Sequence, residues 1–344
     1  MIRIGILCPS DIAFRRFLPS VKNAADFQYI GVAVASPEEW FGHDLNVVDK
    51  QTVDDVQKSE KEKASKFVDS YSGKIFDGYE TMICSDEIDA VYIPLPPALH
   101  FKWAKKALLN GKHVLLEKPF TTSLNDTKEL VKIAKEQGLA LHENYMFVFH
   151  NQFNAVKEIV CSGEIGDVRL YRISFGFPRR DKGDFRYSKP MGGGALLDAG
   201  GYTIKCASTL LGKKSKIVAA TANHIQDFDV DIYGSATMVN EDGVVAQLAF
   251  GMDNDYKCDV EIWCSKGTLT ATRFLTAPAG FAPSCIIKKN QEFETRELPA
   301  DDAFLKSILW FGKCVTDNVV REENYQLIEN QATLVQEFID RANV

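Results

Sequence analysis

Short apolar runs alternate with helix-length amphipathic stretches along the first 145 residues. Runs of strand length occupy residues 2–7, 27–35, 88–93, 113–116 and 139–143. Stretches with the apolar spacing of helices cover residues 14–22, 99–110 and 123–137, and the charge-rich residues 58–66 are expected to form a solvated helix. A continuous apolar run is typical of a strand buried on both faces, and helix-length crossovers join parallel strands. The pattern predicts an α/β Rossmann domain with a doubly wound parallel sheet.

The pattern changes after about residue 145. A predicted helix at 151–162 is followed by runs that alternate or are rich in β-branched residues, at 168–177, 216–226, 233–239, 244–252, 257–263 and 268–274. Turn signals such as Glu241-Asp242-Gly243 separate them. We therefore expect a large, mostly antiparallel open sheet with helices on one face and the other face left for a partner subunit.

Two domains are expected in a chain of 344 residues. Residues 1–122 form the first, and residues 123–145 complete its sheet. Residues 146–344 form a second, α+β domain for substrate binding and oligomerisation. Predicted helices at 304–319 and 325–342 close this second domain.

Composition excludes several classes of function. With 40 Lys and Arg against 47 Asp and Glu, the net charge is −7, which disfavours binding to nucleic acid or to an anionic membrane. No apolar run reaches the roughly 18 residues of a membrane span, and the first residues lack the features of a signal peptide. The eight cysteines and six histidines show no metal-ligand spacing. We expect a cytoplasmic protein without a metal.

The first strand ends in the turn Cys8-Pro9-Ser10-Asp11-Ile12 before a helix. A strand, a turn and a helix in this order place helix amides where a pyrophosphate binds. Cys8 and Ser10 stand where the dinucleotide fingerprint has glycines, so a purely structural turn is the alternative interpretation. The second strand ends at Ser36, where an acidic residue would select NAD. The cofactor is thus NAD or NADP, with a slight preference for NADP.

Glu117 and Lys118 follow the strand at 113–116, and Pro119 ends its ladder pairing. Ligands of open α/β sheets lie at the carboxyl ends of strands, so both side chains stand where chemistry is expected. An ammonium there can meet a substrate oxygen. A surface ion pair that caps the strand is the alternative.

A glycine-rich segment, Gly192-Gly-Gly-Ala-Leu-Leu-Asp198, precedes Tyr202 in the second half. Three successive glycines mark a place where the backbone bends or approaches another group closely. Asp198 and Tyr202 share a face if a helix starts here. A carboxylate and a phenol one turn apart can grip and protonate a carbonyl. The alternative is a helix cap and a packing aromatic.

Together these segments resemble the Gfo/Idh/MocA oxidoreductases over essentially the full length. The resemblance is carried by Val91-Tyr-Ile-Pro-Leu-Pro96, His100, Gly111-Lys-His-Val114, Glu117-Lys118-Pro119, Glu143-Asn144-Tyr-Met-Phe147, the triple glycine, Asp198 and Tyr202. The D-x-x-x-Y form is similar to the branch of dihydrodiol dehydrogenase, glucose-fructose oxidoreductase and sugar 3-ketoreductases. Departures are the Cys8-Pro9-Ser10 turn, Pro97 in place of a common asparagine, and Lys205 where Asp, Asn or Gln is frequent.

The resemblance implies an NAD(P)-dependent oxidoreductase that moves a hydride between nicotinamide and a ring carbon of a sugar or sugar nucleotide. Lys118, Tyr202 and Asp198 are the implied catalytic residues, and Arg186, Asp198 and Tyr202 the implied substrate-binding residues. The implied cofactor-binding residues are Cys8, Pro9, Ser10, Asp11, Ile12, Ser36, Pro94, Leu95, Pro96, His100, Glu117, Lys118 and Asn144. The implied assembly is a homodimer or homotetramer.

Three other functions stay open at this point. A dihydrodiol or free-sugar dehydrogenase would use the same residues on a smaller substrate. A non-catalytic dinucleotide-binding regulator is favoured by the missing glycines and opposed by Lys118, Asp198 and Tyr202. NAD-dependent glycoside cleavage by transient oxidation is also compatible with this family's fold.

Overall fold

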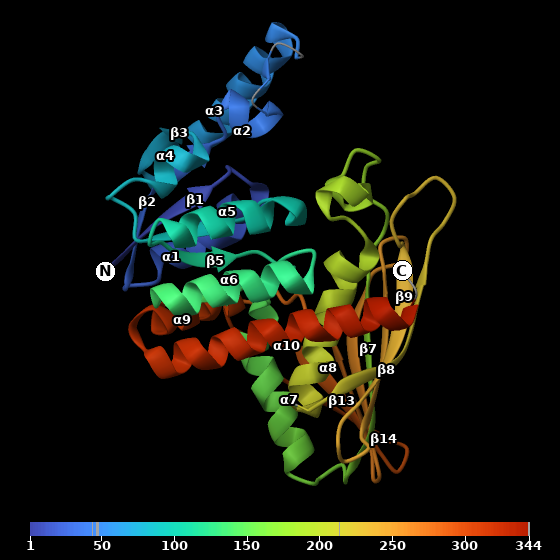
Figure 1. Ribbon diagram of the computed structural model, residues 1–344. Helices are drawn as coiled ribbons and strands as arrows, with labels where there is room; N and C mark the ends of the chain where they lie inside the picture. Colours follow the sequence, from blue (N-terminus) through green and yellow to red (C-terminus); the bar gives the residue numbers. More distant parts are fainter. Residues whose placement is uncertain (43, 46–47, 213, 343–344) are drawn as a thin grey trace. The chain divides into compact units, whose positions relative to one another are not determined.

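The computed structural model describes residues 1–42, 44–45, 48–212 and 214–342 (Figure 1). Contacts divide the chain into two compact units. The first unit comprises Met1–Phe120, Asn125–Asn144 and Ser307–Gln326. The second comprises Thr121–Leu124, Tyr145–Lys306 and Leu327–Val344. Each unit has its own sheet.

The first sheet has the strand order β3-β2-β1-β4-β5-β6, and all its neighbours pair in parallel. The order reverses between β1 and β4, as in dinucleotide-binding doubly wound sheets. This confirms the predicted doubly wound parallel sheet. The strands are β1 (Ile2–Leu7), β2 (Phe27–Val34), β3 (Lys74–Asp77), β4 (Ala90–Ile93), β5 (His113–Leu116) and β6 (Leu141–Glu143).

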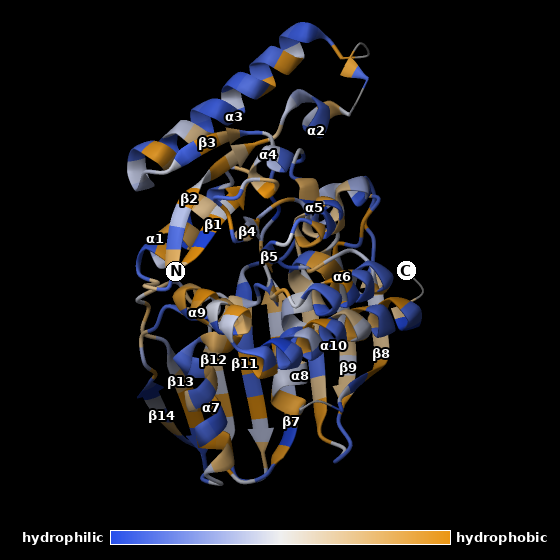
Figure 2. Cartoon of the chain, turned by 60° about the vertical axis from the view of Figure 1, so that its left-hand side comes forward, coloured by the Kyte–Doolittle hydropathy of each residue, from blue (hydrophilic) through white to orange (hydrophobic). Residues whose placement is uncertain are grey.

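Helices connect the strands of the first sheet. The helix after β1 begins with a π-helical turn, η1 (Ala13–Phe17), and continues as α1 (Leu18–Lys22). The others are α2 (Pro37–Phe41), α3 (Lys50–Tyr71), α4 (Tyr79–Ile83), α5 (Pro97–Leu109) and α6 (Leu124–Gln137). Helix α3 is much longer than the predicted helix at 58–66, and Figure 2 shows polar residues along much of it. Neither β3 nor α4 was predicted, because β3 (KIFD) has only two apolar residues between two charged ones and α4 (YETMI) is shorter than two helical turns.

A C-terminal segment, Ser307–Gln326, packs with the first unit, whereas the sequence placed it in the second domain. Buried contacts explain the difference. Phe311 stacks on Phe27 with ring centroids 6.1 Å apart. The Asn324 side chain donates a hydrogen bond to the carbonyl of Leu141 (2.5 Å), and the Tyr325 hydroxyl donates one to the carbonyl of Leu139. Phe27 starts strand β2, whereas Leu139 and Leu141 lie at strand β6, so the segment reaches across the sheet and completes the core of the first unit.

The second sheet has the order β14-β13-β12-β11-β7-β10-β9-β8. Its pairs are antiparallel except for β10 with β7, which confirms a mostly antiparallel sheet. The sequence did not predict β13 and β14. The strands are β7 (Val168–Gly176), β8 (Lys216–Asn223), β9 (Tyr233–Val239), β10 (Val245–Gly251), β11 (Lys257–Cys264), β12 (Thr268–Thr272), β13 (Ser284–Lys289) and β14 (Glu292–Glu297).

Helices cover one face of this sheet. The π-helical turn η6 (Leu196–Gly200) runs into α8 (Gly201–Leu211), which packs on β7 and β10. The second unit also contains η3 (Met146–Phe149), α7 (Asn151–Cys161), η4 (Phe185–Tyr187) and η5 (Lys189–Met191). Helices α9 (Ala303–Thr316) and α10 (Asn318–Ala342) are divided between the units, since Ser307–Gln326 belongs to the first. Figure 2 shows banded colouring along the strands, as expected for alternating residues. Ile173, Leu248 and Val260 are among the buried side chains of these strands. In the described ranges, no helix is both long and apolar enough to cross a membrane.

Candidate active site

The β1 turn keeps the backbone of a dinucleotide-binding loop although its sequence lacks the glycines. Cys8 has φ +89°, in the left-handed region that favours glycine. The Ser10 amide donates to the Cys8 carbonyl (2.9 Å), and the Ser10 hydroxyl accepts from the Ala13 amide (3.3 Å). The chain is helical from Asp11, so its first amides have no partner within the helix. A residue other than glycine therefore occupies a glycine conformation here.

This turn is suited to a pyrophosphate. The helix N-terminus provides amide donors and a partial positive charge at the carboxyl end of β1, next to the point where strand order reverses. Pro9, Ser10 and Ile12 contribute no charge that would repel a phosphate. Asp11 is negative, but its carboxylate pairs with Arg15, which lowers the pKa of Asp11. The predicted residues 8–12 are thus compatible with a bound dinucleotide.

Ser36 lies after β2 and caps α2. Its hydroxyl accepts from the Glu39 amide (3.3 Å), while the Glu39 carboxylate accepts from the Ser36 amide (2.8 Å). Glu39 also accepts from the amides of Tyr79 and Glu80, so its charge is well satisfied. The Ser36 hydroxyl in turn donates to Glu38 (3.0 Å). An exposed carboxylate therefore lies beside Ser36, which the sequence analysis did not take into account when it gave a slight preference to NADP.

His100 ties two loops of the first unit together. Its ring is fully buried, with Nε2 2.7 Å from the Leu95 carbonyl and Nδ1 2.9 Å from the Pro119 carbonyl. Burial lowers the pKa of His100 to about 4, so the ring is neutral at pH 7. Pro94, Leu95 and Pro96 form the turn that it holds. Because both nitrogens face protein carbonyls, the geometry gives His100 a positioning role in the cofactor half, where the sequence predicted a contact with the cofactor.

Glu117 anchors the segment that carries Lys118. It is buried, and its carboxylate accepts hydrogen bonds from the Tyr92 hydroxyl and from the side-chain amide of Asn144, each at 2.7 Å. Burial raises the pKa of Glu117, and these donors partly oppose the rise. Asn144 in turn accepts from the Ser307 hydroxyl (2.8 Å). Glu117 and Asn144 therefore act as a scaffold, which differs from the surface ion pair considered as an alternative.

Lys118 itself is half-buried at the carboxyl end of β5. The peptide bond between Lys118 and Pro119 is cis. The next amide, that of Phe120, donates to the buried carboxylate of Glu143 (3.0 Å). Two buried carboxylates thus fix the backbone on either side of this lysine, as a group that must meet a substrate atom requires.

In the second unit, two of the three glycines allow close backbone approaches. A Cβ on Gly193 would lie 2.4 Å from the carbonyl oxygen of Arg186. A Cβ on Gly194, which has φ +118°, would lie 2.3 Å from the Asp231 carboxylate. The same carboxylate accepts from the Leu196 amide (2.7 Å), at the first turn of η6. Asp231, which the sequence analysis missed, therefore fixes the start of the helix that carries Asp198 and Tyr202.

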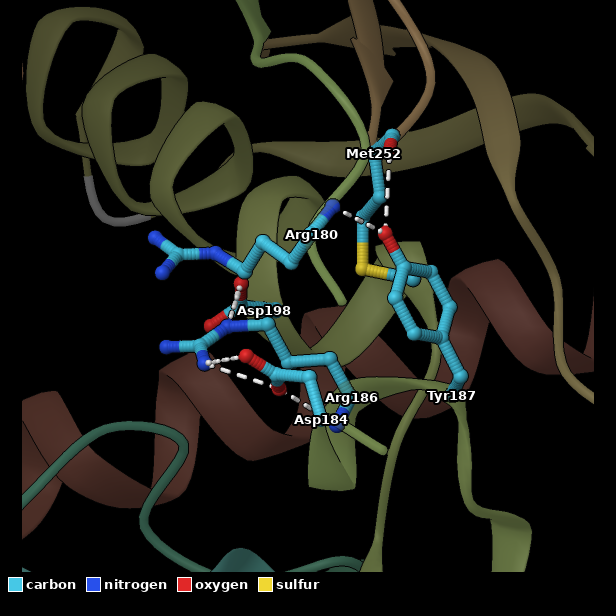
Figure 3. A network of polar contacts seen from close by, with 6 residues as sticks. All are labelled: Arg180, Asp184, Arg186, Tyr187, Asp198 and Met252. Atoms are coloured by element: carbon cyan, nitrogen blue, oxygen red, sulfur yellow. Dashed lines mark hydrogen bonds and ion pairs between the residues drawn. The ribbon is translucent and has the colours of Figure 1, made fainter. Parts of the chain in front are cut away.

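Arg186 links two carboxylates (Figure 3). Its Nε donates to Asp198 (2.7 Å), and its Nη1 donates to both oxygens of Asp184 (3.1 and 3.2 Å). The side chains of Arg186, Asp184 and Asp198 are 20%, 17% and 13% exposed. The sequence predicted that Arg186 contacts substrate directly. The structure instead shows that much of its guanidinium holds Asp198, and that Asp184 completes the cluster.

Tyr202 lies in an aromatic enclosure on α8. Its ring contacts those of Tyr145, Phe175 and Phe147, at centroid distances of 5.1, 5.2 and 5.8 Å. The first contact is edge-on, at 88°. A Cβ on Gly201 would lie 2.1 Å from the Tyr145 hydroxyl, so this glycine lets Tyr145 reach the turn that carries Tyr202. Two rings from the start of η3 and one from β7 thus fix the orientation of the phenol.

Some of these contributors had a sequence signal and others had none. The burial of Phe175 could be predicted from the alternation of β7, because every second side chain of this strand points toward the core. Asp184 is two residues before Arg186 and caps η4. Asp231 lies in the loop between β8 and β9, more than thirty residues from Leu196, and no local pattern connects the two.

Comparison with protein families gives two matches. Residues 29–145 match the model described as an oxidoreductase family with an NAD-binding Rossmann fold. Residues 153–270 match the model of the GFO/IDH/MocA C-terminal domain. The two matches cover most of the two sheets described above.

Curated relatives cover nearly the whole chain. A dTDP-3,4-didehydro-2,6-dideoxy-alpha-D-glucose 3-reductase from Actinomadura kijaniata is 37% identical over 97% of this chain and 93% of its own. Proteins of the same name from Saccharopolyspora spinosa and Streptomyces violaceoruber are 33% and 39% identical, over 97% and 91% of this chain and 96% and 85% of their own.

Solved structures agree with the relatives. KijD10, a 3-ketoreductase from Actinomadura kijaniata crystallised with NADP and TDP-benzene, superposes with a TM-score of 0.88 at 35% identity. The match covers 99% of this chain and 97% of KijD10. The expected two-domain fold and oxidoreductase class are confirmed. The chain belongs to the Gfo/Idh/MocA family of oxidoreductases, with an NAD-binding Rossmann fold and the C-terminal domain of that family.

Proposed function

We propose that this protein is an NADP(H)-dependent reductase of a nucleotide-linked keto-deoxysugar, acting on the ketone at carbon 3. The observation that carries the proposal is the set of relatives that are 30–39% identical over 91–100% of the chain and share one name, a dTDP-sugar 3-reductase. The chain retains the residue types that such a reaction needs, in an anchored lysine and an enclosed phenol.

When bound, the dinucleotide supplies a hydride to the carbonyl carbon. The residues that would hold it are those of the β1 turn, residues 8–12, together with Ser36 and the Pro94–Pro96 turn. These are neutral or amide-donating groups, apart from Asp11, which is paired with Arg15. The protein's own contribution is to orient the substrate and to move one proton.

In our proposal, Tyr202 is the general acid in reduction and the base in the reverse direction. It transfers its hydroxyl proton to the substrate oxygen as the carbonyl carbon is reduced, and the phenol then regains a proton from solvent. Lys118 donates a hydrogen bond to the same oxygen, which stabilises the charge that develops there. Asp198, held by Arg186, accepts a hydrogen bond from a neighbouring sugar hydroxyl.

The proposal is tested by turnover with a panel of substrates. The panel contains dTDP-3,4-didehydro-2,6-dideoxy-α-D-glucose, free sugars and a dihydrodiol, each followed by NAD(P)H absorbance. We expect kcat/KM for the dTDP-linked ketone to exceed that of every other compound by orders of magnitude. Equal or better turnover of a free sugar would refute the assignment of substrate.

A free-sugar dehydrogenase is the second candidate. A D-xylose 1-dehydrogenase (NADP(+)) from Haloferax volcanii is 28% identical over 74% of this chain and 79% of its own. This similarity is weaker than that to the 3-reductases, in both identity and coverage. The same panel distinguishes the two candidates, because oxidation of D-xylose needs no nucleotide.

We also propose that the outer face of the second sheet joins copies of this chain in a homodimer or homotetramer. Support comes from a shallow cavity of about 420 Å³ on β7, β8, β9 and β10, lined mostly by small uncharged side chains such as Ala219, Ser235 and Ala249. Trp263 is 41% exposed on the neighbouring strand β11. Light scattering of the protein and of Ala249→Arg tests this, and an unchanged mass would refute it.

A cytoplasmic location also stays a prediction.

A further inference from the structure

Arginine and aromatic side chains cluster at the end of the second sheet where strands β7, β10 and β12 finish. Gly176 at the end of β7 pairs with Gly251 and with Lys257, and Thr272 at the end of β12 pairs with Asp259. The connections after β7, β10 and β12 therefore all leave the sheet at this same end. They carry four arginines, namely Arg179, Arg180, Arg186 and Arg273.

These arginines fall into two pairs. Arg179 and Arg186 bind carboxylates, those of Asp253 and of Asp184 with Asp198. The guanidinium groups of Arg180 and Arg273 instead lie over aromatic rings, 5.4 Å from Phe177 and 5.5 Å from Tyr256. Within the described ranges, neither of these two guanidinium groups makes a hydrogen bond or an ion pair. A guanidinium stacked on a ring uses its face and leaves the N–H groups at its edge available.

Arg180 is presented by a fixed backbone. Its amide donates to the Tyr187 hydroxyl (2.9 Å), and that hydroxyl donates to the Met252 carbonyl (3.4 Å). In Figure 3 its side chain extends to the same side as Arg186 and Asp198, away from the Tyr187 ring. Arg273 is also constrained, with φ +49°, a conformation that is uncommon for residues other than glycine, asparagine and aspartate.

A series of contacting aromatic rings connects this end of the sheet with Tyr202, the proposed general acid. Tyr202 contacts Phe175 (5.2 Å), Phe175 contacts Phe177 (5.8 Å), and Phe177 lies under Arg180. Strand β11 separates β7 from β12, so the ends of these two strands are about 10 Å apart. Arg180 and Arg273 therefore follow two strands that finish at the same end of the sheet, and the Arg180 side is connected through aromatic contacts to Tyr202.

We propose that Arg180 and Arg273 bind the diphosphate of the nucleotide-linked substrate and so select a nucleoside diphosphate sugar over a free sugar. The inference rests on the proposed function, because it assumes that the sugar is reduced near Tyr202. A guanidinium presents parallel N–H donors that match phosphate oxygens, and each arginine brings a full positive charge. Arg179 and Arg186 already pair with carboxylates, so the positive charge that attracts the diphosphate comes from Arg180 and Arg273.

The test measures binding of dTDP and of thymidine by calorimetry, without turnover. The variants are Arg180→Gln, Arg273→Gln and Arg180→Lys. The matched control is Arg169→Gln, which removes an exposed arginine, ion-paired with Asp167, from the other end of β7. We expect each glutamine variant to weaken dTDP binding on the order of tenfold, and the lysine variant to weaken it less. Thymidine binding, NADPH binding and the control should be unchanged.

Two results would overturn the inference. One is a dTDP affinity that stays within twofold of wild type in both glutamine variants. The other is an equal loss in Arg169→Gln, which would indicate a general effect of charge. If the wild type reduces the dTDP-linked ketone while both variants keep its KM, the subsite is refuted and the proposed function stands. If the wild type neither binds dTDP nor reduces the ketone, the proposed function fails as well.

Discussion

Replacing Arg186 by methionine would leave two largely buried carboxylates without their shared partner. The side chains of Asp184 and Asp198 are only 17% and 13% exposed, so water can replace the lost hydrogen bonds only in part. Methionine preserves much of the volume of the side chain. The experiment therefore isolates the guanidinium group, which contacts Asp198 at 2.7 Å and Asp184 at 3.1 Å.

The expected cost is about 3 kcal/mol in the free energy of unfolding. Breaking a buried ion pair by removing one partner costs about 3–5 kcal/mol, and the remaining exposure of this cluster places it at the lower end. Because Asp198 would lose the guanidinium group that positions it, kcat/KM should also fall, on the order of 100-fold. Arg186→Lys should recover little of this, because a single ammonium cannot replace the fork that bridges two carboxylates.

Urea unfolding and steady-state kinetics measure the two effects. Arg179→Met is the matched control, since Arg179 contacts Asp253 through two nitrogens at 2.9 and 3.0 Å but is 51% exposed. It should lose far less stability than Arg186→Met, because an exposed ion pair is screened by solvent. If Arg186→Met is as stable and as active as this control, the cluster does not position Asp198 and the reasoning is wrong.

Three further predictions concern the cofactor half. Cys8→Gly should keep the affinity for NADPH within about threefold, whereas Cys8→Val should lower the melting temperature, because a β-branched residue tolerates φ +89° less well than cysteine does; a stable valine variant would contradict this. Glu38→Gln should lower KM for NADPH relative to NADH, because it removes the carboxylate hydrogen-bonded to Ser36; an unchanged ratio of the two KM values would argue against it. The pKa of His100 is about 4 when folded and 6.5 ordinarily, so its stabilising contribution is present above pH 6.5 and is lost as the pH falls toward 4. The loss is at most about 3 kcal/mol, and urea midpoints of wild type and His100→Asn should converge over that range if this is right.

The sequence predicted most of the fold because its periodicities are regular. Buried runs such as residues 90–93 and 114–116 are apolar throughout, and the strands of the second sheet alternate. The segment Ser307–Gln326 was assigned to the wrong unit, because helical periodicity shows which face is buried but not which core buries it. Only the contacts of Phe311 with Phe27 and of Asn324 with Leu141 decide that question.

The sequence could single out Lys118, Asp198 and Tyr202 by residue type and spacing alone, and their catalytic roles stay predictions. The candidate site was not predictable where function depends on contacts between distant residues. The Asp231 carboxylate at the Leu196 amide is such a contact. The backbone conformation of Cys8 was not predictable either. A cysteine at position 8 does not match the glycine of a dinucleotide-binding turn, whereas its φ of +89° does.

The central claim is that hydride passes from the nicotinamide to carbon 3 of a nucleotide-linked sugar, with Tyr202 supplying the proton. The most direct measurement uses NADPH deuterated at the transferring position with dTDP-3,4-didehydro-2,6-dideoxy-α-D-glucose, followed by NMR of the product. The account predicts one deuterium at carbon 3, and a rate lowered by about 100-fold or more in Tyr202→Phe while NADPH still binds. Deuterium at another carbon, or a wild-type rate in that variant, would contradict it.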